Sequence, residues 1–259
     1  MERPTTPWPC LMPEPDILVL DDPAREAADF IAGILSAAAG QKGVASFVLA
    51  GGGTPLALYR SLASPLYRQA VPWGKVHFFW GDERLVPPDD PGSNFAAAGN
   101  AFLEPLSIPP GNIHRIEGGL APHEAAADYA ARLSAWAADF DPGAPNPWPR
   151  FDLVLLGLGE DGHTASLFPG SPVLVDSAVM AVTADYRGRP AGRVTLTPPV
   201  FNDAHAVYFL VSGANKAEAV YQTLYSDESV RFPALRIRPV DGQVTWLLDR
   251  AAAAALDAY

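Results

Sequence analysis

The sequence predicts an α/β protein built on a mostly parallel sheet with helices on both faces. Short apolar runs of strand length recur along the chain, and their continuous apolar character is typical of buried strands. Most of these runs lead into a polar or glycine-rich loop and then into a helical pattern. The 259 residues are enough to bury a sizeable core.

The first unit is a short strand over 17–20 and a helix with Asp21 or Asp22 as its cap and Pro23 in its first turn. Further strands are expected over 46–50 and 76–80. The helical patterns cover the following residues: 56–62, 94–103 and 121–140. A proline-rich loop over 141–150 follows.

The second half repeats this alternation of strands and helices. Strands are expected over the following residues: 151–156, 179–183, 193–196, 206–212 and 244–248. A helix is expected over 214–225, and Asp249 can cap an alanine-rich tail helix. Because strands on both sides of the 141–150 loop have the same buried character, we expect one α/β domain over 16–259. The proline-rich residues 1–15 are expected to be a flexible arm.

Composition limits the classes of partner. The net charge of −11 and the presence of only three lysines argue against nucleic acid and anionic membranes as partners, but not against a small anionic ligand. Cys10 is the only cysteine, which excludes an intrachain disulfide and a cysteine-built metal site. The chain has no apolar run of about 18 residues and no signal-peptide pattern. We therefore expect a cytoplasmic monomer or small homo-oligomer, without metal or cofactor.

Ligands of parallel sheets bind in loops at the carboxyl ends of strands, here 51–55, 81–94, 157–170 and 212–216. In the first loop, Gly52 and Gly53 allow close backbone approach, while Thr54 is a candidate N-cap and Pro55 a candidate first helical residue. Such a helix start offers free N–H groups to an anion, although a plain tight turn explains the same residues equally well.

The second loop holds Asp82, Glu83 and Arg84. Arg84 is a candidate for binding phosphate or substrate, and Asp82 for orienting it. Without other evidence, a local ion pair that closes the loop is the better interpretation. Asn94, at the end of this loop, is a candidate helix cap or ligand contact.

The third loop contains Gly157-x-Gly159-x-x-Gly162, which matches the dinucleotide-binding fingerprint. We reject that match because Glu160 and Asp161 would repel a pyrophosphate and Pro169 leaves little room for the following helix. Instead, Asp161 and His163 suggest a general base, since a carboxylate can orient an imidazole that takes a proton from water. Ser166 is not expected to act as a nucleophile, because the Gly-x-Ser-x-Gly sequence of a nucleophile elbow is absent around it.

Two further cations lie near expected site loops. Arg193 begins a possible strand. Lys216 lies near a helix start, where it opposes the helix dipole, which makes sense if an anion is bound nearby. A solvated lysine is an equally good interpretation.

Several motifs occur together in a fixed order, and they resemble the 6-phosphogluconolactonase family, within a larger group that includes glucosamine-6-phosphate isomerase/deaminase. The motifs are Leu49-Ala50-Gly51-Gly52-Gly53-Thr54-Pro55, Gly81-Asp82-Glu83-Arg84 with Val86-Pro87, Ser93-Asn94, Gly157 to Pro169, and Arg193-Val194-Thr195-Leu196-Thr197. The resemblance covers about residues 16–248, and the His163 segment is its most specific part.

The resemblance implies a Rossmann-like three-layer α/β/α fold of the NagB/RpiA/CoA-transferase type. It also implies hydrolysis of 6-phospho-D-glucono-1,5-lactone to 6-phosphogluconate, a step of the oxidative pentose phosphate pathway. By matching position, His163 is expected to be the general base and Asp161 its partner. The candidates for binding the sugar and its phosphate are Gly52, Gly53, Thr54, Asp82, Arg84, Asn94, Gly159, Arg193 and Lys216.

Two rival functions stay open at this point. The first is an isomerase or deaminase of the same fold, but Arg84 stands where the deaminase has tyrosine, and the glutamate after its histidine segment is missing here. The second is a sugar-phosphate sensor, which would need an attached DNA-binding module that residues 1–15 cannot form.

Overall fold

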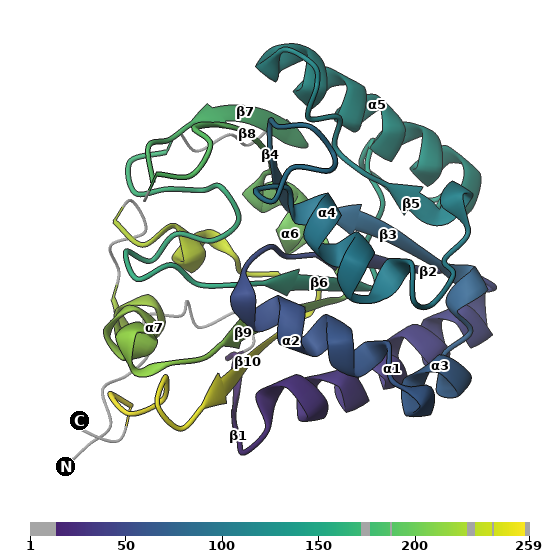
Figure 1. Cartoon of the computed structure of the whole chain (residues 1–259). Helices are drawn as coiled ribbons and strands as arrows, with labels where there is room; N and C mark the ends of the chain where they lie inside the picture. Colours follow the sequence, from purple (N-terminus) through teal and green to yellow (C-terminus); the bar gives the residue numbers. More distant parts are fainter. Residues whose placement is uncertain (1–13, 172–176, 187, 227–230, 240, 257–259) are drawn as a thin grey trace.

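The computed structural model describes residues 14–171, 177–186, 188–226, 231–239 and 241–256, and Figure 1 shows their arrangement. The expected N-terminal arm falls mainly on residues 1–13, which lie outside the described residues. The described strands form a seven-stranded sheet and a three-stranded sheet, with the site loops between them.

The large sheet is parallel throughout, which confirms the predicted fold class. Its strands in spatial order are β1 (Asp16–Leu20), β10 (Gln243–Asp249), β9 (Ala206–Val211), β6 (Leu153–Leu156), β2 (Ala45–Leu49), β3 (Val76–Trp80) and β5 (Ile113–His114). Strand β5 was not expected from the sequence, because two residues carry no periodicity.

The direction of strand addition reverses between β2 and β6. From β2 the sheet grows through β3 to β5, whereas from β6 it grows through β9 and β10 to the opposite edge. Where the loops after two neighbouring strands run in opposite directions, a crevice forms at the carboxyl ends of these strands. Ligands of this fold class bind in such crevices. Both the glycine loop after β2 and the His163 loop after β6 begin at this crevice.

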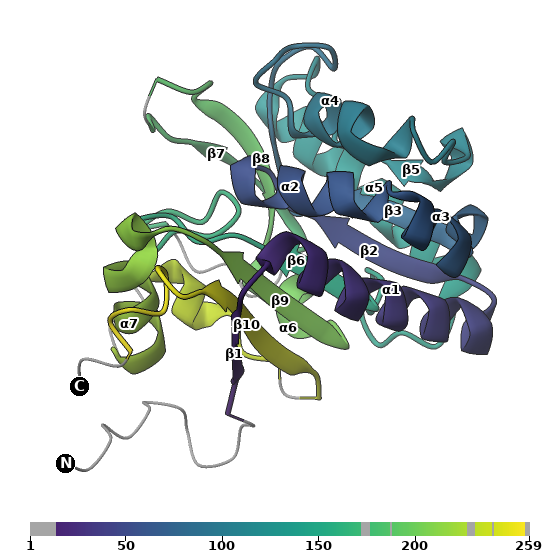
Figure 2. The same cartoon turned by 60° about the horizontal axis from the view of Figure 1, so that its bottom comes forward.

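Helices cover both faces of the large sheet (Figures 1 and 2). They are α1 (Pro23–Lys42), α2 (Gly53–Leu62), α3 (Pro65–Ala70), α4 (Asn94–Ala98) with a π-helical continuation η2 (Gly99–Leu103), α5 (Pro122–Phe140), α6 (Pro198–Asn202) and α7 (Ala217–Tyr225). The predicted cap of α1 is confirmed, since the Asp22 carboxylate accepts from the N–H of Arg25 at 3.2 Å.

Two adjacent phenylalanines of β3 show how the two helical layers attach. Side chains of successive strand residues point to opposite faces. Phe78 packs edge-on against Phe102 of η2, with ring centroids 5.4 Å apart. Phe79 packs against Trp136 of α5 at 5.5 Å. Both phenylalanines are fully buried, so the alternating strand joins both layers to one core.

The small sheet is antiparallel and was not foreseen as a separate sheet. It consists of β4 (Asp82–Arg84), β8 (Gly192–Leu196) and β7 (Val179–Thr183), with β8 in the middle. The expected loop 81–94 therefore begins with a strand. Its three residues are charged, so no apolar alternation marks the strand, and its partner lies more than 100 residues away in sequence.

Two tyrosines complete the hydrogen bonds at the carboxyl ends of β2 and β3. The Tyr59 hydroxyl of α2 donates to the carbonyl of Ala50 and accepts from its N–H. The Tyr129 hydroxyl of α5 does the same for Trp80. Buried backbone groups without partners are costly, so these phenols stabilise the strand ends from which the site loops start.

The predicted tail helix after Asp249 is wrong. Residues 250–256 form turns. The Asp249 carboxylate does accept from the N–H of Ala252 at 2.6 Å, but it also accepts from the N–H of Gly213 at 2.9 Å. The Asp249 carboxylate, at the end of β10, therefore holds both the loop after β9 and the C-terminal turns. Among the described residues, no helix is long and apolar enough to cross a membrane.

A pair of histidines lies at the β3–β5 edge of the large sheet. His77 Nδ1 and His114 Nε2 are 2.9 Å apart, and the Trp136 indole donates to His77 Nδ1 at 2.9 Å. The sequence does not predict this cluster because its members come from three distant elements. Burial, together with the nearby His77 and Arg132, lowers the pKa of His114 to about 4.

This lowered pKa predicts a loss of stability in acid. The unfolded chain binds a proton on His114 near pH 6.5, whereas the folded chain does so only near pH 4. The free energy of unfolding should therefore fall as the pH drops through this window. In His114→Phe, whose ring can still stack on Phe79, the fall should be smaller. Denaturant unfolding between pH 7 and pH 4 measures it.

The matched control is His123→Phe, because His123 is exposed in the first turn of α5. It should keep the pH dependence of the parent protein. An identical acid slope in the parent and His114→Phe would contradict the assignment.

Candidate active site

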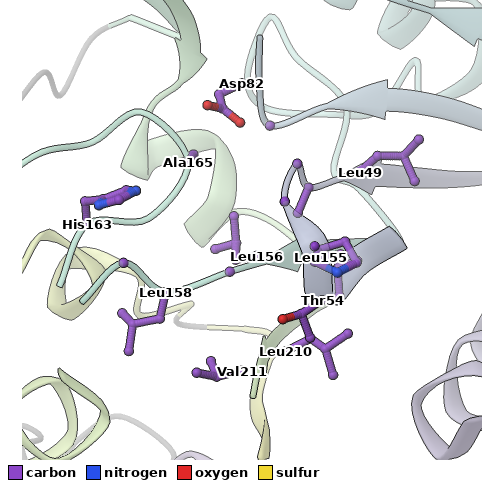
Figure 3. A pocket seen from close by; sticks show the side chains of 18 of the residues that line it. Leu49, Thr54, Asp82, Leu155, Leu156, Leu158, His163, Ala165, Leu210 and Val211 are labelled. Atoms are coloured by element: carbon purple, nitrogen blue, oxygen red, sulfur yellow. The ribbon is translucent and has the colours of Figure 1, made fainter. Parts of the chain in front are cut away.

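A cavity of about 240 Å³ opens at the crevice between β2 and β6 (Figure 3). His163, Asp82 and Thr54 stand on three sides of it in this view. The residues that line it are Leu49–Pro55, Gly81, Asp82, Arg84, Leu155–Gly159, His163, Ala165, Tyr186, Arg189, Arg193, Leu210–Ser212 and Lys216. The structure thus places eight of the nine predicted binding residues around His163, the predicted base. They are Gly52, Gly53, Thr54, Asp82, Arg84, Gly159, Arg193 and Lys216.

Asp161 and His163 are in direct contact, which their two-residue spacing alone did not establish. His163 Nδ1 lies 2.5 Å from Asp161 Oδ1, which also accepts from the backbone N–H of His163. Burial opposes ionisation of Asp161, but the hydrogen bond and charge of His163 outweigh it and lower the pKa of Asp161. A carboxylate on Nδ1 favours the tautomer whose Nε2 has the free lone pair. The pair can therefore act as an oriented base.

Two aromatic rings hold the imidazole in place. Phe168 and Tyr186 each have their ring centroid 4.7 Å from that of His163, and the Tyr186 ring meets it edge-on. Only 15% of the His163 side chain is exposed. The packing restricts rotation of the ring and keeps bulk water away from most of it, which preserves the contact with Asp161.

Glycine at 159 is required by the pair itself. A Cβ on Gly159 would lie 2.0 Å from His163 Nδ1 and 2.5 Å from Asp161 Oδ1, so one of the two side chains would have to move. The Gly159 N–H donates to the carbonyl of His163 at 2.7 Å and closes the loop. Within 157–171 no helix begins, in agreement with our rejection of a dinucleotide site.

The start of α2 differs from the prediction in its first residues. The helix begins at Gly53, with Gly52 as the N-cap at φ 110°, a value that favours glycine. Thr54 lies inside the first turn and is not the cap, and no side chain caps this end. The N–H groups of the first turn lie at the cavity wall, where the helix dipole favours an anion.

Four cationic residues surround the cavity, in contrast to the acidic charge of the whole chain. Arg193 is only 3% exposed, and its Nε and Nη2 have no hydrogen-bond partner in the described part of the chain. Its guanidinium lies 5.5 Å from the Phe168 ring centroid. Burial lowers its pKa, partly offset by the negative charge of Asp82. A buried, unsatisfied guanidinium is suited to an anionic ligand.

Two of the other three cations, Arg84 and Lys216, are anchored by backbone carbonyls. Arg84 Nη1 donates to Gly92 at 2.7 Å, while its buried Nε has no hydrogen-bond partner among the described residues. Lys216 Nζ donates to Leu158 at 2.7 Å from the start of α7. Both side chains thus line the cavity with their positions fixed by the backbone, and Arg84 has further donors for a ligand.

Tyr186 and Arg189 were not predicted from the sequence as site residues. They form an isolated bridge in the connection between β7 and β8, and both line the cavity. The segment Tyr186-Arg187-Gly188-Arg189 combines an aromatic ring, two arginines and a glycine between two candidate strands. That combination was the available signal, but its relevance depends on the small sheet, which folds this connection over His163.

Asn94 lies behind the cavity wall rather than on it. Ser93 is the cap of α4, accepting from the N–H of Ala96, and Asn94 is the first helical residue. The Asn94 amide donates to the carbonyl of Asp82 at 2.9 Å and to its Oδ1 at 3.2 Å. The expected helix cap and ligand contact are thus both replaced by support of Asp82. A Cβ on Gly51 would collide with Asn94 at 2.0 Å, which explains that glycine.

Glu83 closes its loop through backbone groups. Its buried carboxylate accepts from the N–H groups of Arg84, Asn94 and Phe95 and from the Ser93 hydroxyl. Burial raises the pKa of Glu83, and these four hydrogen bonds counteract the rise without cancelling it. Within the described residues, no group of three or more His, Cys, Asp or Glu side chains is arranged to hold a metal ion.

Substitution of Gly159 tests the geometry of the Asp161–His163 pair. In Gly159→Ala the added methyl group should separate the two side chains and destabilise the fold by about 1–3 kcal/mol, the usual cost of overpacking. NMR of the imidazole nitrogens reports the hydrogen bond, and thermal unfolding reports the stability.

Gly157→Ala is the matched control, because nothing lies within 4 Å of a Cβ at that position. It should leave the His163 nitrogen signals unchanged. Unchanged signals in Gly159→Ala would contradict the steric argument.

Known proteins are similar to this chain over most of its length. The family model described as "Glucosamine-6-phosphate isomerases/6-phosphogluconolactonase" matches residues 20–246. The 6-phosphogluconolactonase of Synechocystis sp. is 41% identical over 220 residues, which cover 84% of this chain and 87% of the relative. That of Mycobacterium tuberculosis is 40% identical over 253 residues, covering 95% and 97%.

A solved structure leads to the same family. The 6-phosphogluconolactonase of Trypanosoma brucei has a TM-score of 0.78 and 31% sequence identity, covering 93% of this chain and 98% of that one. The family model, the sequence relatives and the shared fold place the chain in the glucosamine-6-phosphate isomerase/6-phosphogluconolactonase family.

Proposed function

We propose that this chain hydrolyses 6-phospho-D-glucono-1,5-lactone to 6-phosphogluconate in the oxidative pentose phosphate pathway, with His163 as the general base. The chain is an enzyme of a family that includes a 6-phosphogluconolactonase 41% identical to it. The observation that carries the proposal is the Asp161–His163 pair beside a cavity surrounded by cations. A base and an anion-binding wall are what a phosphorylated lactone requires.

The pair supports a direct attack by water. His163 Nε2 takes a proton from a water molecule as its oxygen bonds to C1 of the lactone, and Asp161 stabilises the imidazolium that forms. The carbonyl oxygen then carries the negative charge, for which the α2 N–H groups or Arg84 are the available donors. When the C1–O bond of the ring breaks, the imidazolium returns its proton to the departing oxygen.

Phosphate binding supplies the orientation. The phosphate is the fixed negative charge of the substrate, and the available partners are Arg193, Arg189, Lys216 and the start of α2. Anchoring the remote phosphate holds C1 next to the base and converts a random encounter into a positioned one.

The alternative function, deamination of an amino sugar phosphate, can be tested separately. Arg84 replaces the tyrosine of the deaminase motif, and the glutamate that follows its histidine segment is missing here. Ring opening of an amino sugar needs that extra acid, whereas lactone hydrolysis does not. Ammonia release from glucosamine 6-phosphate would identify a deaminase.

Removal of the base should abolish most turnover. We expect His163→Ala to lower kcat by roughly 100- to 10,000-fold, the usual contribution of general acid–base catalysis, while the protein remains folded. The assay generates the lactone in situ and follows its disappearance. The spontaneous hydrolysis rate is subtracted, because this lactone also opens without enzyme.

Thermal unfolding serves as the folding control, and Asp161→Asn should lower kcat less than His163→Ala because the base itself remains. A folded His163→Ala protein with nearly parental turnover would refute the mechanism.

Loss of an anion-binding cation should chiefly weaken substrate binding. We expect Arg193→Met and Lys216→Ala each to raise KM by about 10- to 100-fold with a smaller change in kcat, as for a lost charge-assisted hydrogen bond. Steady-state kinetics measures both constants.

Arg250→Ala is the matched charge control, because Arg250 is 81% exposed and pairs with Asp21. Its KM should equal that of the parent. If KM stays unchanged in both Arg193→Met and Lys216→Ala, these residues do not bind the phosphate.

A further inference from the structure

We propose that Ser166 is a positioning residue that acts through Asp82 and fixes this carboxylate on the cavity wall. The inference rests on the proposed lactonase function and deepens it. It assigns to Ser166 the task of setting where the sugar hydroxyls are held relative to His163.

The contact between the two residues is short and buried. The Ser166 side chain is fully buried and donates to Asp82 Oδ2 at 2.6 Å. The Asn94 amide holds the other oxygen, Oδ1, at 3.2 Å. Because both oxygens are held, rotation of the carboxylate is restricted. Asp82 is 7% exposed and lines the cavity, whereas Ser166 and Asn94 support it from behind.

The backbone around Ser166 explains why its hydroxyl points to Asp82. Ala165 has φ 49°, a left-handed conformation that alanine rarely adopts. Reciprocal N–H to carbonyl bonds between Thr164 and Leu167 close the turn around it. The Ser166 N–H donates to the Thr195 hydroxyl of β8 at 3.3 Å. The turn thus exposes Ala165 to the cavity and directs Ser166 into the wall.

One short loop therefore carries both the proposed base and the support of a second part of the cavity wall. His163 and Ser166 are three residues apart, yet the first lines the cavity and the second holds Asp82 of β4. Asp82 is an acceptor suited to sugar hydroxyls, and its charge offsets that of the buried Arg193. A loosened Asp82 would misplace the sugar before it would affect proton transfer at His163.

A double-mutant cycle tests this coupling. We expect Ser166→Ala to raise KM for the lactone by about tenfold, as for a lost hydrogen bond to a charged group, with a smaller change in kcat. In an Asp82→Ala background the same substitution should change KM less than twofold, because residues that act through one another are not additive. Asp82→Asn provides a second background if Asp82→Ala does not fold.

Thr164→Val is the matched control within the same turn. The Thr164 hydroxyl is buried and donates to the carbonyl of Gly157 at 2.8 Å, not to Asp82. This variant should lower the melting temperature and leave KM unchanged. A purely structural role of Ser166 would give the same pattern in Ser166→Ala, and that result, or equal KM effects in both backgrounds, would overturn the proposal.

Calorimetry can measure binding of 6-phosphogluconate to the same set of variants. This measurement separates the present inference from the proposed function. A parent protein that binds 6-phosphogluconate without hydrolysing the lactone would refute the lactonase function. The positioning role would then stand or fall on whether the Ser166→Ala loss of affinity disappears in the Asp82→Ala background. A parent protein that neither binds nor hydrolyses would overturn both.

Discussion

Two adjacent buried carboxylates, Asp82 and Glu83, connect strand β4 of the small sheet to the His163 loop and to the start of α4, and the candidate site depends on them. Buried charges are costly unless hydrogen bonds satisfy them. Glu83 is satisfied by the loop and the first turn of α4, and Asp82 by Ser166 and Asn94. Each carboxylate therefore requires a particular arrangement of distant segments. The small sheet, the His163 loop and the start of α4 are consequently held in one geometry at the mouth of the large sheet.

The cavity wall is rich in positive charge, whereas the net charge of the whole chain is negative. A net charge of −11 coexists with a cavity wall that carries three arginines and a lysine. The local field decides what the cavity binds, since exposed charges more than about 10 Å away are screened by salt. The general acidity is unfavourable for large polyanions, while the buried guanidinium of Arg193, whose Nε and Nη2 have no partner among the described residues, is suited to a small anion within hydrogen-bond distance.

The proposed catalysis and the proposed anion binding depend on different structural features. The proposed base, His163, is oriented by a single close acid, two aromatic rings and a glycine that leaves room for the pair. The cationic wall proposed to bind the anion is assembled from a helix start, a strand residue, a connection and a lysine, which come from four separate parts of the chain. The base is therefore local in sequence, whereas the wall exists only after the sheets have formed.

The sequence by itself determined the α/β class, most strands and helices, and a candidate base, His163, with Asp161 two residues before it, because periodicity and spacing are local properties. The structure alone decided that these two side chains touch. Only the tertiary structure decided that Thr54 lies inside a helix, that Asn94 supports Asp82, and that Tyr186 and Arg189 reach the cavity. Tyr186 and Arg189 reach the cavity because the small sheet positions the connection between β7 and β8. This sheet could not be predicted, since its strand β4 is too short and too charged for a periodic signal and is formed only by long-range pairing with β8.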